Sequence, residues 1–253
     1  MTLLRAGLCS VTLRSASVRR VVTLAAEADL ACIEWGADVH APPGGAADLE
    51  DVAALTRGAG LAVASYGTYW RATADQDGRA LLPAARELGC RRLRVWAGTT
   101  GSAGAAPEER AAVVHRVQAL ADLAAAHGLE LAFEHHDRTL ADTVPATLEL
   151  LAAVDRPNVG TYWQPRVGEA TDVALAGLAQ LLPQVRAVHV FSWWPGITRL
   201  RLAERADLWT GAIELLASTG RPVDLLLEFL PDDDEQLLAD EAGRLREWIA
   251  QAP

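Results

Sequence analysis

Hydrophobic and polar residues alternate along this chain in two patterns that repeat from end to end. Short runs that are apolar, β-branched or rich in leucine predict buried strands. Longer stretches rich in alanine and leucine, with an apolar residue at every third or fourth position, predict amphipathic helices. The strands are expected at 5–10, 31–36, 61–66, 92–97, 130–134, 158–162, 186–191 and 223–228. Helices are expected from Val18 and over 107–127, 140–154 and 234–249.

The number of repeats indicates the fold class. Eight strand–helix units over 253 residues give about 32 residues each, the size of one unit of a (β/α)8 barrel. No linker or change of composition divides the chain, so we expect one TIM-barrel domain over residues 1–253. A doubly wound open sheet is the alternative, but it needs fewer strands and usually has a glycine-rich loop after the first one.

The composition of the chain limits the classes of partner that such a domain could bind. The chain has 23 basic and 33 acidic residues, a formal net charge of −10, which argues against nucleic acid and anionic membranes. The three cysteines, Cys9, Cys32 and Cys90, lie too far apart for a CxxC motif, and no apolar stretch approaches the roughly 18 residues that span a bilayer. We expect a cytoplasmic protein with reduced thiols, and leave a homodimer open.

Aromatic and polar residues gather where the predicted strands end. In a TIM barrel these ends form one pocket, at the face that carries the active site. Aromatic rings there pack against the C–H faces of a sugar, and charged or polar groups bind its hydroxyls. We therefore expect a carbohydrate substrate, with these binding residues: Glu34, His40, Tyr66, Trp70, Arg71, Trp96, His136, Trp163, Trp193 and Arg199.

Four further residues at the ends of neighbouring strands could share a cation. They are Glu134, Gln164, His189 and Glu228. An ionisable group within an apolar strand needs a partner that offsets its desolvation. An oxygen-rich set with one imidazole suits Mn²⁺, Mg²⁺ or Co²⁺ better than it suits a structural zinc ion.

At these residues the chain resembles the sugar-phosphate isomerase/epimerase family of xylose isomerase-like TIM barrels, which includes ketose 3-epimerases, hydroxypyruvate isomerase and inosose dehydratase. The resemblance is carried by IEWGADVH (33–40), SYGTYW (65–70), FEHH around Glu134, VGTYWQP (159–165), VHVF around His189 and LLLEF around Glu228. It implies Glu134, His189 and Glu228 as metal ligands. At strand six the family has an Asp followed three residues later by a His, where this chain has Gln164 and Val167. The neutral carboxamide implies that the divalent metal is bound weakly.

The resemblance also implies a reaction. Glu134 and Glu228 would act as the acid–base pair that moves a proton beside a carbonyl, giving an isomerase or epimerase that works through an enediolate. Two alternatives use the same barrel: a lyase or dehydratase acting on a keto-sugar or keto-glycoside, and a sugar-binding barrel without catalysis. An apurinic endonuclease would need more metal ligands and a basic surface, and the net charge of −10 argues against it.

Overall fold

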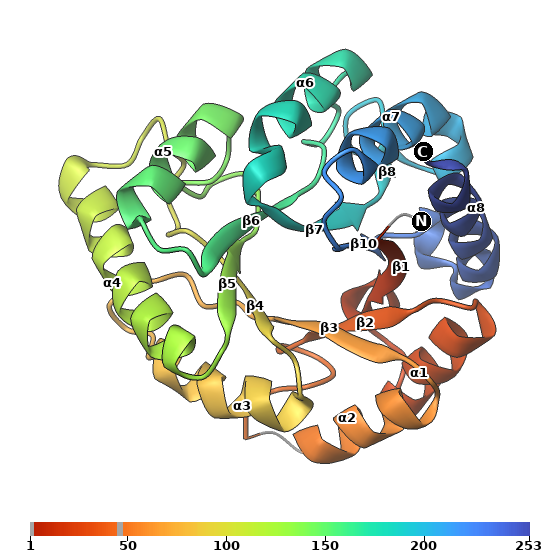
Figure 1. Ribbon diagram of the computed structural model, residues 1–253, viewed down its shortest axis with the longest axis horizontal. Coiled ribbons are helices and arrows are strands. Elements are labelled where there is room, and N and C mark those ends of the chain that lie inside the picture. The colour runs from red at the N-terminus through yellow and green to blue at the C-terminus, as the bar shows by residue number, and fades with distance from the viewer. Residues whose placement is uncertain (1–2, 45–47) are drawn as a thin grey trace.

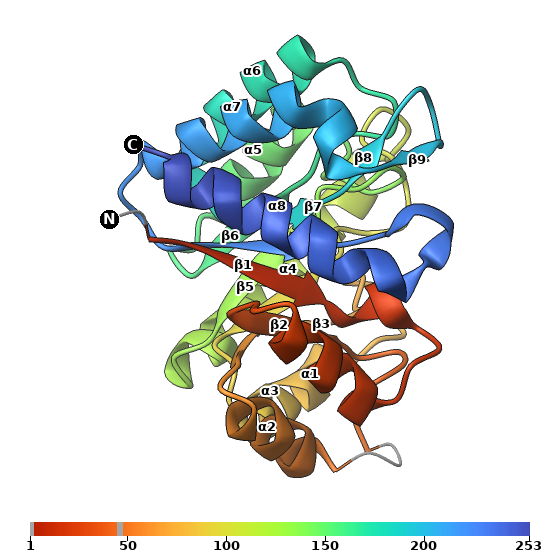
Figure 2. The same cartoon turned by 90° about the vertical axis from the view of Figure 1, so that its right-hand side faces the viewer.

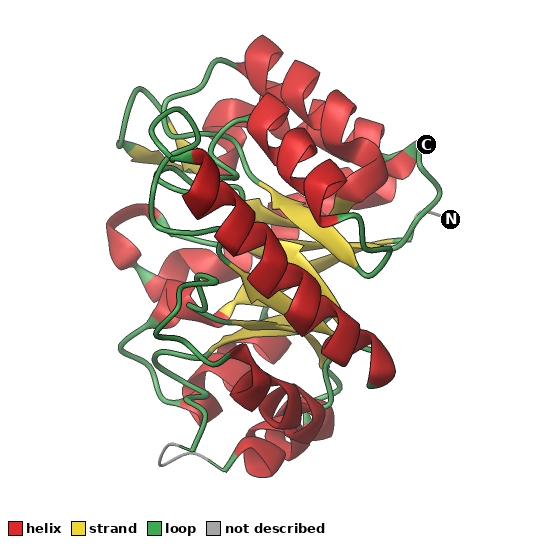
Figure 3. Ribbon diagram, turned by 90° about the vertical axis from the view of Figure 1, so that its left-hand side faces the viewer, coloured by secondary structure: helices red, strands yellow, loops and turns green. Residues whose placement is uncertain are grey.

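Eight parallel strands close into a barrel, and helices surround it (Figures 1 and 3). The computed structural model describes residues 3–44 and 48–253. The barrel strands are β1 (Leu4–Cys9), β2 (Cys32–Gly36), β3 (Ala62–Gly67), β4 (Arg92–Val95), β5 (Glu130–Phe133), β6 (Val159–Trp163), β7 (Val185–Val190) and β10 (Val223–Leu227). Around the barrel the order is β1-β10-β7-β6-β5-β4-β3-β2. The predicted (β/α)8 fold is confirmed.

Helices alternate with the barrel strands, and four of them lie where the sequence predicted a helix. They are α1 (Val18–Glu27), α2 (Leu49–Gly58), α3 (Leu81–Leu88), α4 (Pro107–Ala126), α5 (Val144–Val154), α6 (Thr171–Leu181), α7 (Ala206–Ala217) and α8 (Leu238–Gln251). Two predicted starts are wrong. Helix α5 begins at Val144 rather than at residue 140, because the Thr143 side chain caps it by accepting from Ala146 N. Helix α8 begins after two short 3-10 turns rather than at Asp234.

A small hairpin lies beyond the barrel and was not expected from the sequence. Its strands are β8 (Ser192–Trp193) and β9 (Arg199–Leu200), which pair antiparallel. Figure 2 shows this hairpin at the opposite end of the barrel from the two chain termini. It therefore lies at the carboxyl ends of the strands, where the predicted site is. Among the described helices, none is long and apolar enough to cross a membrane.

The barrel interior is arranged in layers. At the amino ends of the strands, Asp224 pairs with both Arg5 and Arg92, and Arg92 also pairs with Glu130. Above these ion pairs the interior is tightly packed, and a Cβ on Gly7 would lie 2.6 Å from Cys32 Sγ and 2.8 Å from Leu226 Cδ2. This narrow middle layer separates the ion pairs from a second group of charged residues at the carboxyl ends.

Candidate active site

Six buried polar side chains meet inside the carboxyl end of the barrel. Each belongs to a different barrel strand or is the residue directly after one. Every second side chain of such a strand points into the barrel, and these six occupy inward positions. They are Glu34 on β2, Arg94 on β4, Glu134 after β5, Gln164 after β6, His189 on β7 and Glu228 after β10. The topology thus gathers the four predicted metal ligands with two more charged groups.

Glu34 is the most deeply enclosed of the acids, with no exposed surface. Tyr162 Oη and Ser65 Oγ donate hydrogen bonds to its Oε2 at 2.6 and 2.7 Å. Its Oε1 lies 3.0 Å from Arg94 Nε and 3.2 Å from His189 Nε2. Burial alone would raise the pKa of Glu34, but the charge of Arg94 and the hydrogen bonds from His189 and Tyr162 hold it well below its usual value. Glu34 is therefore a carboxylate that positions its neighbours rather than one that faces the barrel mouth.

Arg94 joins two of the acids, and the sequence analysis did not single it out. Its guanidinium forms ion pairs with Glu34 and with Glu134, and its side chain is 2% exposed. A Cβ on Gly67 would lie 2.8 Å from Arg94 Nη2 and 2.9 Å from Glu34 Oε1, so glycine there leaves room for the pair. The sequence signal was its position between Leu93 and Val95: outward apolar neighbours turn the residue between them inward.

His189 faces oxygen atoms on both sides of its ring. Its Nε2 faces Glu34, while Nδ1 lies 2.9 Å from Gln164 Oε1 and 3.4 Å from Glu228 Oε2. When two ligand atoms are each about 2.1 Å from one ion and form a right angle at it, they lie about 3.0 Å from each other. Gln164 and Glu228 thus each present an oxygen to His189 Nδ1 at a distance close to that between two ligands of one ion.

A second observation favours a cation at this point. Glu228 Oε2 is buried and has no hydrogen-bond partner among the described residues, which is costly for a charged oxygen. Cys9, Glu34 and His189 also place ligand atoms within 4.8 Å of one another. That second group suits a cation less well, because Arg94 already neutralises Glu34. In addition, burial and the adjacent Glu34 and Glu228 raise the pKa of the Cys9 thiol well above its usual value. Of the predicted set, Gln164, His189 and Glu228 therefore fit a divalent ion, whereas Glu134 is paired with Arg94.

Aromatic and cationic side chains surround the mouth above this layer. Trp96 and His136 follow Arg94 and Glu134 by two residues and point the same way. The Trp96 ring lies 4.4 Å from the His136 ring, and the Arg71 guanidinium covers it at 3.9 Å. On the other side, Arg199 lies over Trp193 at 5.5 Å, and Trp193 contacts Phe229.

A hollow of about 410 Å³ opens beside the metal-ligand set. Its lining includes His136, Arg138, Gln164, Arg166 and Trp193. It therefore connects Gln164 to the aromatic residues of the mouth. This is the position that a small substrate needs.

Other residues predicted to bind substrate lie away from the mouth. Tyr66 and Trp163 are buried between strands and helices, where Tyr66 donates to the Ala41 carbonyl oxygen at 2.6 Å and Trp163 packs on Trp209. His40 is held by Ser10 Oγ and the Ala16 carbonyl oxygen, each at 3.1 Å. Trp70 belongs to the same buried core. We assign packing roles to these four side chains.

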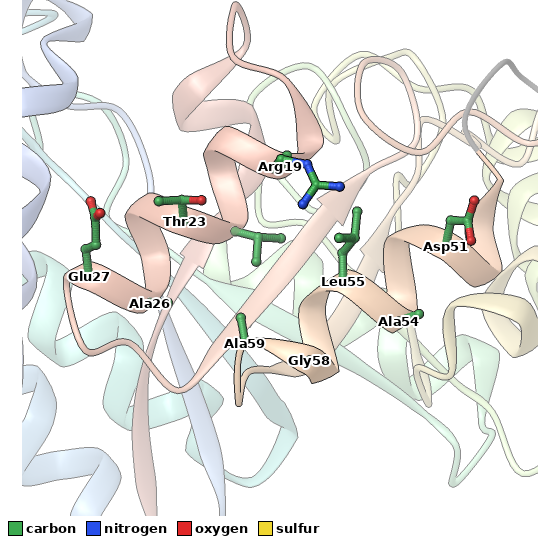
Figure 4. A pocket seen from close by; sticks show the side chains of 10 residues that line it. Arg19, Thr23, Ala26, Glu27, Asp51, Ala54, Leu55, Gly58 and Ala59 are labelled. Carbon is green, nitrogen blue, oxygen red and sulfur yellow. The ribbon is translucent and has the colours of Figure 1, made fainter.

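A larger hollow, of about 750 Å³, lies outside the barrel between α1 and α2. In Figure 4, Arg19 and Thr23 extend from α1, and Asp51 and Leu55 extend from α2. Its lining is mostly small and apolar and brings together none of the buried acids described above. The candidate site is therefore the hollow at the barrel mouth.

Comparisons with known proteins show which family the chain is similar to. Residues 22–167 match the family model described as xylose isomerase-like TIM barrel. A stretch of 68 residues is 43% identical to a 3-dehydroshikimate dehydratase of Bacillus anthracis, a match that covers 27% of this chain and 24% of the relative. The match thus spans about a quarter of the relative's length.

Solved structures share the whole fold. A probable 3-DHS dehydratase of Bacillus anthracis has a TM-score of 0.77 at 20% identity, with 96% of this chain and 98% of that chain covered. An L-ribulose 3-epimerase has a TM-score of 0.71 at 16% identity, with 98% and 93% covered. A D-allulose 3-epimerase of Methylomonas sp. has a TM-score of 0.72 at 18% identity, with 99% and 98% covered.

Proposed function

Because this chain belongs to the xylose isomerase-like TIM-barrel family, we propose that it is a lyase that removes water from a small hydroxylated ketone. The first step takes a proton from the carbon beside the carbonyl. The observation that carries the proposal is the unequal state of the two predicted catalytic acids. Arg94 holds the charge of Glu134 in an ion pair, whereas Glu228 Oε2 has no hydrogen-bond partner among the described residues.

This inequality favours elimination over epimerisation. An epimerase that works through an enediolate needs one group to remove the proton and another to return a proton to the opposite face. Here Glu134 is the group that would have to act opposite Glu228, and its ion pair with Arg94 weakens it as a base. A dehydration needs only one such group, because the same carboxyl can receive the proton and pass it on.

The proposed steps balance as follows. Glu228 accepts the proton from the carbon beside the carbonyl, and the C–H electron pair forms a carbon–carbon double bond as the carbonyl oxygen gains negative charge. The electrons then return, the C–O bond at the next carbon breaks, and the protonated Glu228 gives its proton to the departing hydroxyl. The products are water and an unsaturated ketone, and Glu228 is again a carboxylate.

The divalent ion in this proposal is Mn²⁺, Mg²⁺ or Co²⁺, held by Glu134, Gln164, His189 and Glu228. When bound, such an ion polarises a carbonyl oxygen and stabilises the negative charge that develops on it. Glu228 would supply the carboxylate that is not already paired with a guanidinium, since Arg94 pairs with Glu134. Glu228 would hold the ion through Oε2, and its Oε1, which lies 4.0 Å from Cys9 Sγ, would take the substrate proton.

The mouth supplies binding for the rest of the substrate. Trp193 gives the hollow a flat apolar surface, and His136 offers a ring nitrogen. The Arg71 guanidinium forms no ion pair with an acid among the described residues, so it is free to bind a hydroxyl or an anionic group. These features support a small polyhydroxylated ketone as the substrate class.

The test is incubation in deuterium oxide with a panel of hydroxylated ketones, including ketoses, inososes, keto-glycosides and 3-dehydroshikimate. Each is supplied with Mn²⁺ and, separately, with chelator, and followed by mass spectrometry. A product lighter by one water supports the proposal, whereas a deuterated product that keeps its water makes the chain an epimerase. No exchange with any compound overturns both. Glu228→Gln should lower turnover by about 100-fold or more, while Glu149→Gln on the exposed face of α5 should have no effect.

A further inference from the structure

We infer that the amino end of the barrel is a second binding site, which takes a phosphate group. This end lies opposite the candidate active site, on the side of both chain termini (Figure 2). A hollow of about 690 Å³ opens there. Charged side chains from five barrel strands meet beside it. The inference does not depend on the proposed reaction.

The first observation is a chain of ion pairs in which three guanidiniums share two carboxylates. Arg5 Nη2 lies 2.7 Å from Asp224 Oδ1, and Asp224 Oδ2 lies 3.3 Å from Arg92 Nη1. Arg92 Nε lies 2.7 Å from Glu130 Oε1, and the other oxygen of Glu130 lies 3.6 Å from Arg186 Nε. Strands β4 and β10 are not neighbours in the barrel, so Arg92 reaches Asp224 through the interior. Arg186, at the end of the chain, has the longest of these contacts.

The second observation is that the backbone is shaped to place Arg186 there. The pairing of β7 with β6 passes from Val185 to Ala187, so Arg186 is an extra residue at a β-bulge. A bulge of this kind changes the direction of a side chain. Arg186 then crosses β6 at Gly160, where a Cβ would lie 2.6 Å from Arg186 Cγ. The bulge and the glycine together bring a third guanidinium to two carboxylates that already have arginine partners.

Two further arginines border this end and have no carboxylate partner among the described residues. Arg91 is exposed at the hollow, and its guanidinium forms no hydrogen bond or ion pair with the described chain. Arg221, directly before the lining residue Pro222, donates to two backbone carbonyl oxygens. With the three guanidiniums of the ion-pair chain, five cations stand against the two acids of the hollow. This end therefore carries an excess of positive charge, in a chain whose net charge is −10.

A phosphate group matches this excess. Guanidinium groups bind phosphate oxygens through paired N–H donors, and a tetrahedral dianion can accept from several of them at once. The guanidiniums of Arg91 and Arg186 donate no hydrogen bond to any described residue, so they have donors to offer. Glu130 and Asp224, the acids of the lining, are already paired with arginine. The hollow has room for more than the phosphate group itself, so free phosphate and a phosphomonoester share this chemistry.

The experiment measures binding by isothermal titration calorimetry and by the melting temperature. Inorganic phosphate, ribose 5-phosphate and ribose are added at one ionic strength, which is set with NaCl. Arg186→Gln removes the last guanidinium of the ion-pair chain, and Arg91→Gln removes an exposed cation without touching the ion pairs. Arg19→Gln, on the exposed face of α1, is the matched control, since this guanidinium also has no ion pair among the described residues. Arg71→Met reports any phosphate that binds at the barrel mouth instead.

We expect the wild-type protein to bind inorganic phosphate and to melt at a higher temperature in phosphate than in NaCl alone. Arg186→Gln should weaken binding about tenfold or more, because a charge-assisted hydrogen bond is lost. Arg91→Gln should weaken it by a smaller factor, whereas Arg19→Gln and Arg71→Met should bind like wild type. If ribose 5-phosphate binds more tightly than phosphate, with the same loss in Arg186→Gln, the ligand is a phosphomonoester. Equal affinities, with no binding of ribose, identify free phosphate.

Two results would overturn the inference. One is phosphate that neither binds nor raises the melting temperature beyond the effect of NaCl, since the arginines would then serve only the ion pairs and the helix ends nearby. The other is binding that Arg71→Met abolishes and both amino-end variants keep, which would place the phosphate at the barrel mouth. If Arg186→Gln does not fold, Arg91→Gln decides, and an affinity equal to that of Arg19→Gln overturns the inference.

Discussion

Arg94→Met should be one of the most destabilising single substitutions in this chain. Methionine fills a similar volume but removes a positive charge that faces Glu34 and Glu134 inside the barrel. Removing one partner of a buried ion pair costs about 3–5 kcal/mol, because the remaining charge stays desolvated. Two acids lose their partner here, so we expect at least the upper part of that range. For a chain of this length this corresponds to a fall in melting temperature of about 10 °C or more.

The assay is urea unfolding followed by circular dichroism, at pH 7 and again at pH 5. The acids left behind in the variant are more easily protonated than in wild type. The loss of unfolding free energy should therefore be smaller at pH 5 than at pH 7. Arg156→Met is the matched control, because Arg156 pairs with Asp122 on the surface and such pairs contribute about 0–1 kcal/mol.

The reasoning fails if Arg94→Met costs no more than the surface control. It also fails if the cost is the same at both pH values, since the variant's instability would then not come from ionised Glu34 and Glu134. Arg94→Lys separates charge from geometry. It keeps the positive charge but cannot bind two carboxylates with a planar fork, so its cost should lie between those of Met and wild type.

Three further outcomes are expected. Burial lowers the pKa of His40, so the unfolded chain binds a proton first as the pH falls below about 6.5. This histidine should lower the unfolding free energy by up to about 1.4 kcal/mol per pH unit. In urea titrations His40→Gln should reduce the slope, and the remainder should come from His135, whose pKa burial lowers to about 4. Gly67→Ala should cost about 1–3 kcal/mol in the same assay, because its Cβ would collide with Arg94 and Glu34; an unchanged stability would mean that the pair has room to move. Arg71→Met should raise KM about tenfold and leave kcat unchanged if Arg71 binds substrate, and equal loss in both constants would contradict a binding role.

The barrel could be predicted from the sequence because the pattern that marks each strand or helix is local. Each strand is a short apolar run, and each helix repeats at its own period, so eight units could be located without knowing their contacts. The β8–β9 hairpin was missed because two strands of two residues leave no such pattern. Helix starts were missed where a single side chain decides them, as Thr143 does for α5.

The site was predicted less completely, because the direction of a side chain depends on register. Successive residues of a strand point to opposite faces, so a shift of one residue exchanges the pocket for the core. Gln164 faces the barrel interior, while Trp163 beside it packs outward. Arg94 was missed because its strand is rich in arginine. An arginine in such a strand is expected to face solvent, and only the structure shows that this side chain points into the barrel.

The narrow middle of the barrel closes the pocket at its inner end. Below the charged layer the space around Gly7 has no room even for a methyl group, and ion pairs between Asp224 and the arginines lie beyond it. Substrate and product must therefore share one entrance, past Trp96 and Trp193. A product that still carries a carbonyl and hydroxyls would occupy the same surfaces as the next substrate molecule. If the chain is the proposed lyase, its turnover should slow as its own product accumulates, because product and substrate compete for the same surfaces.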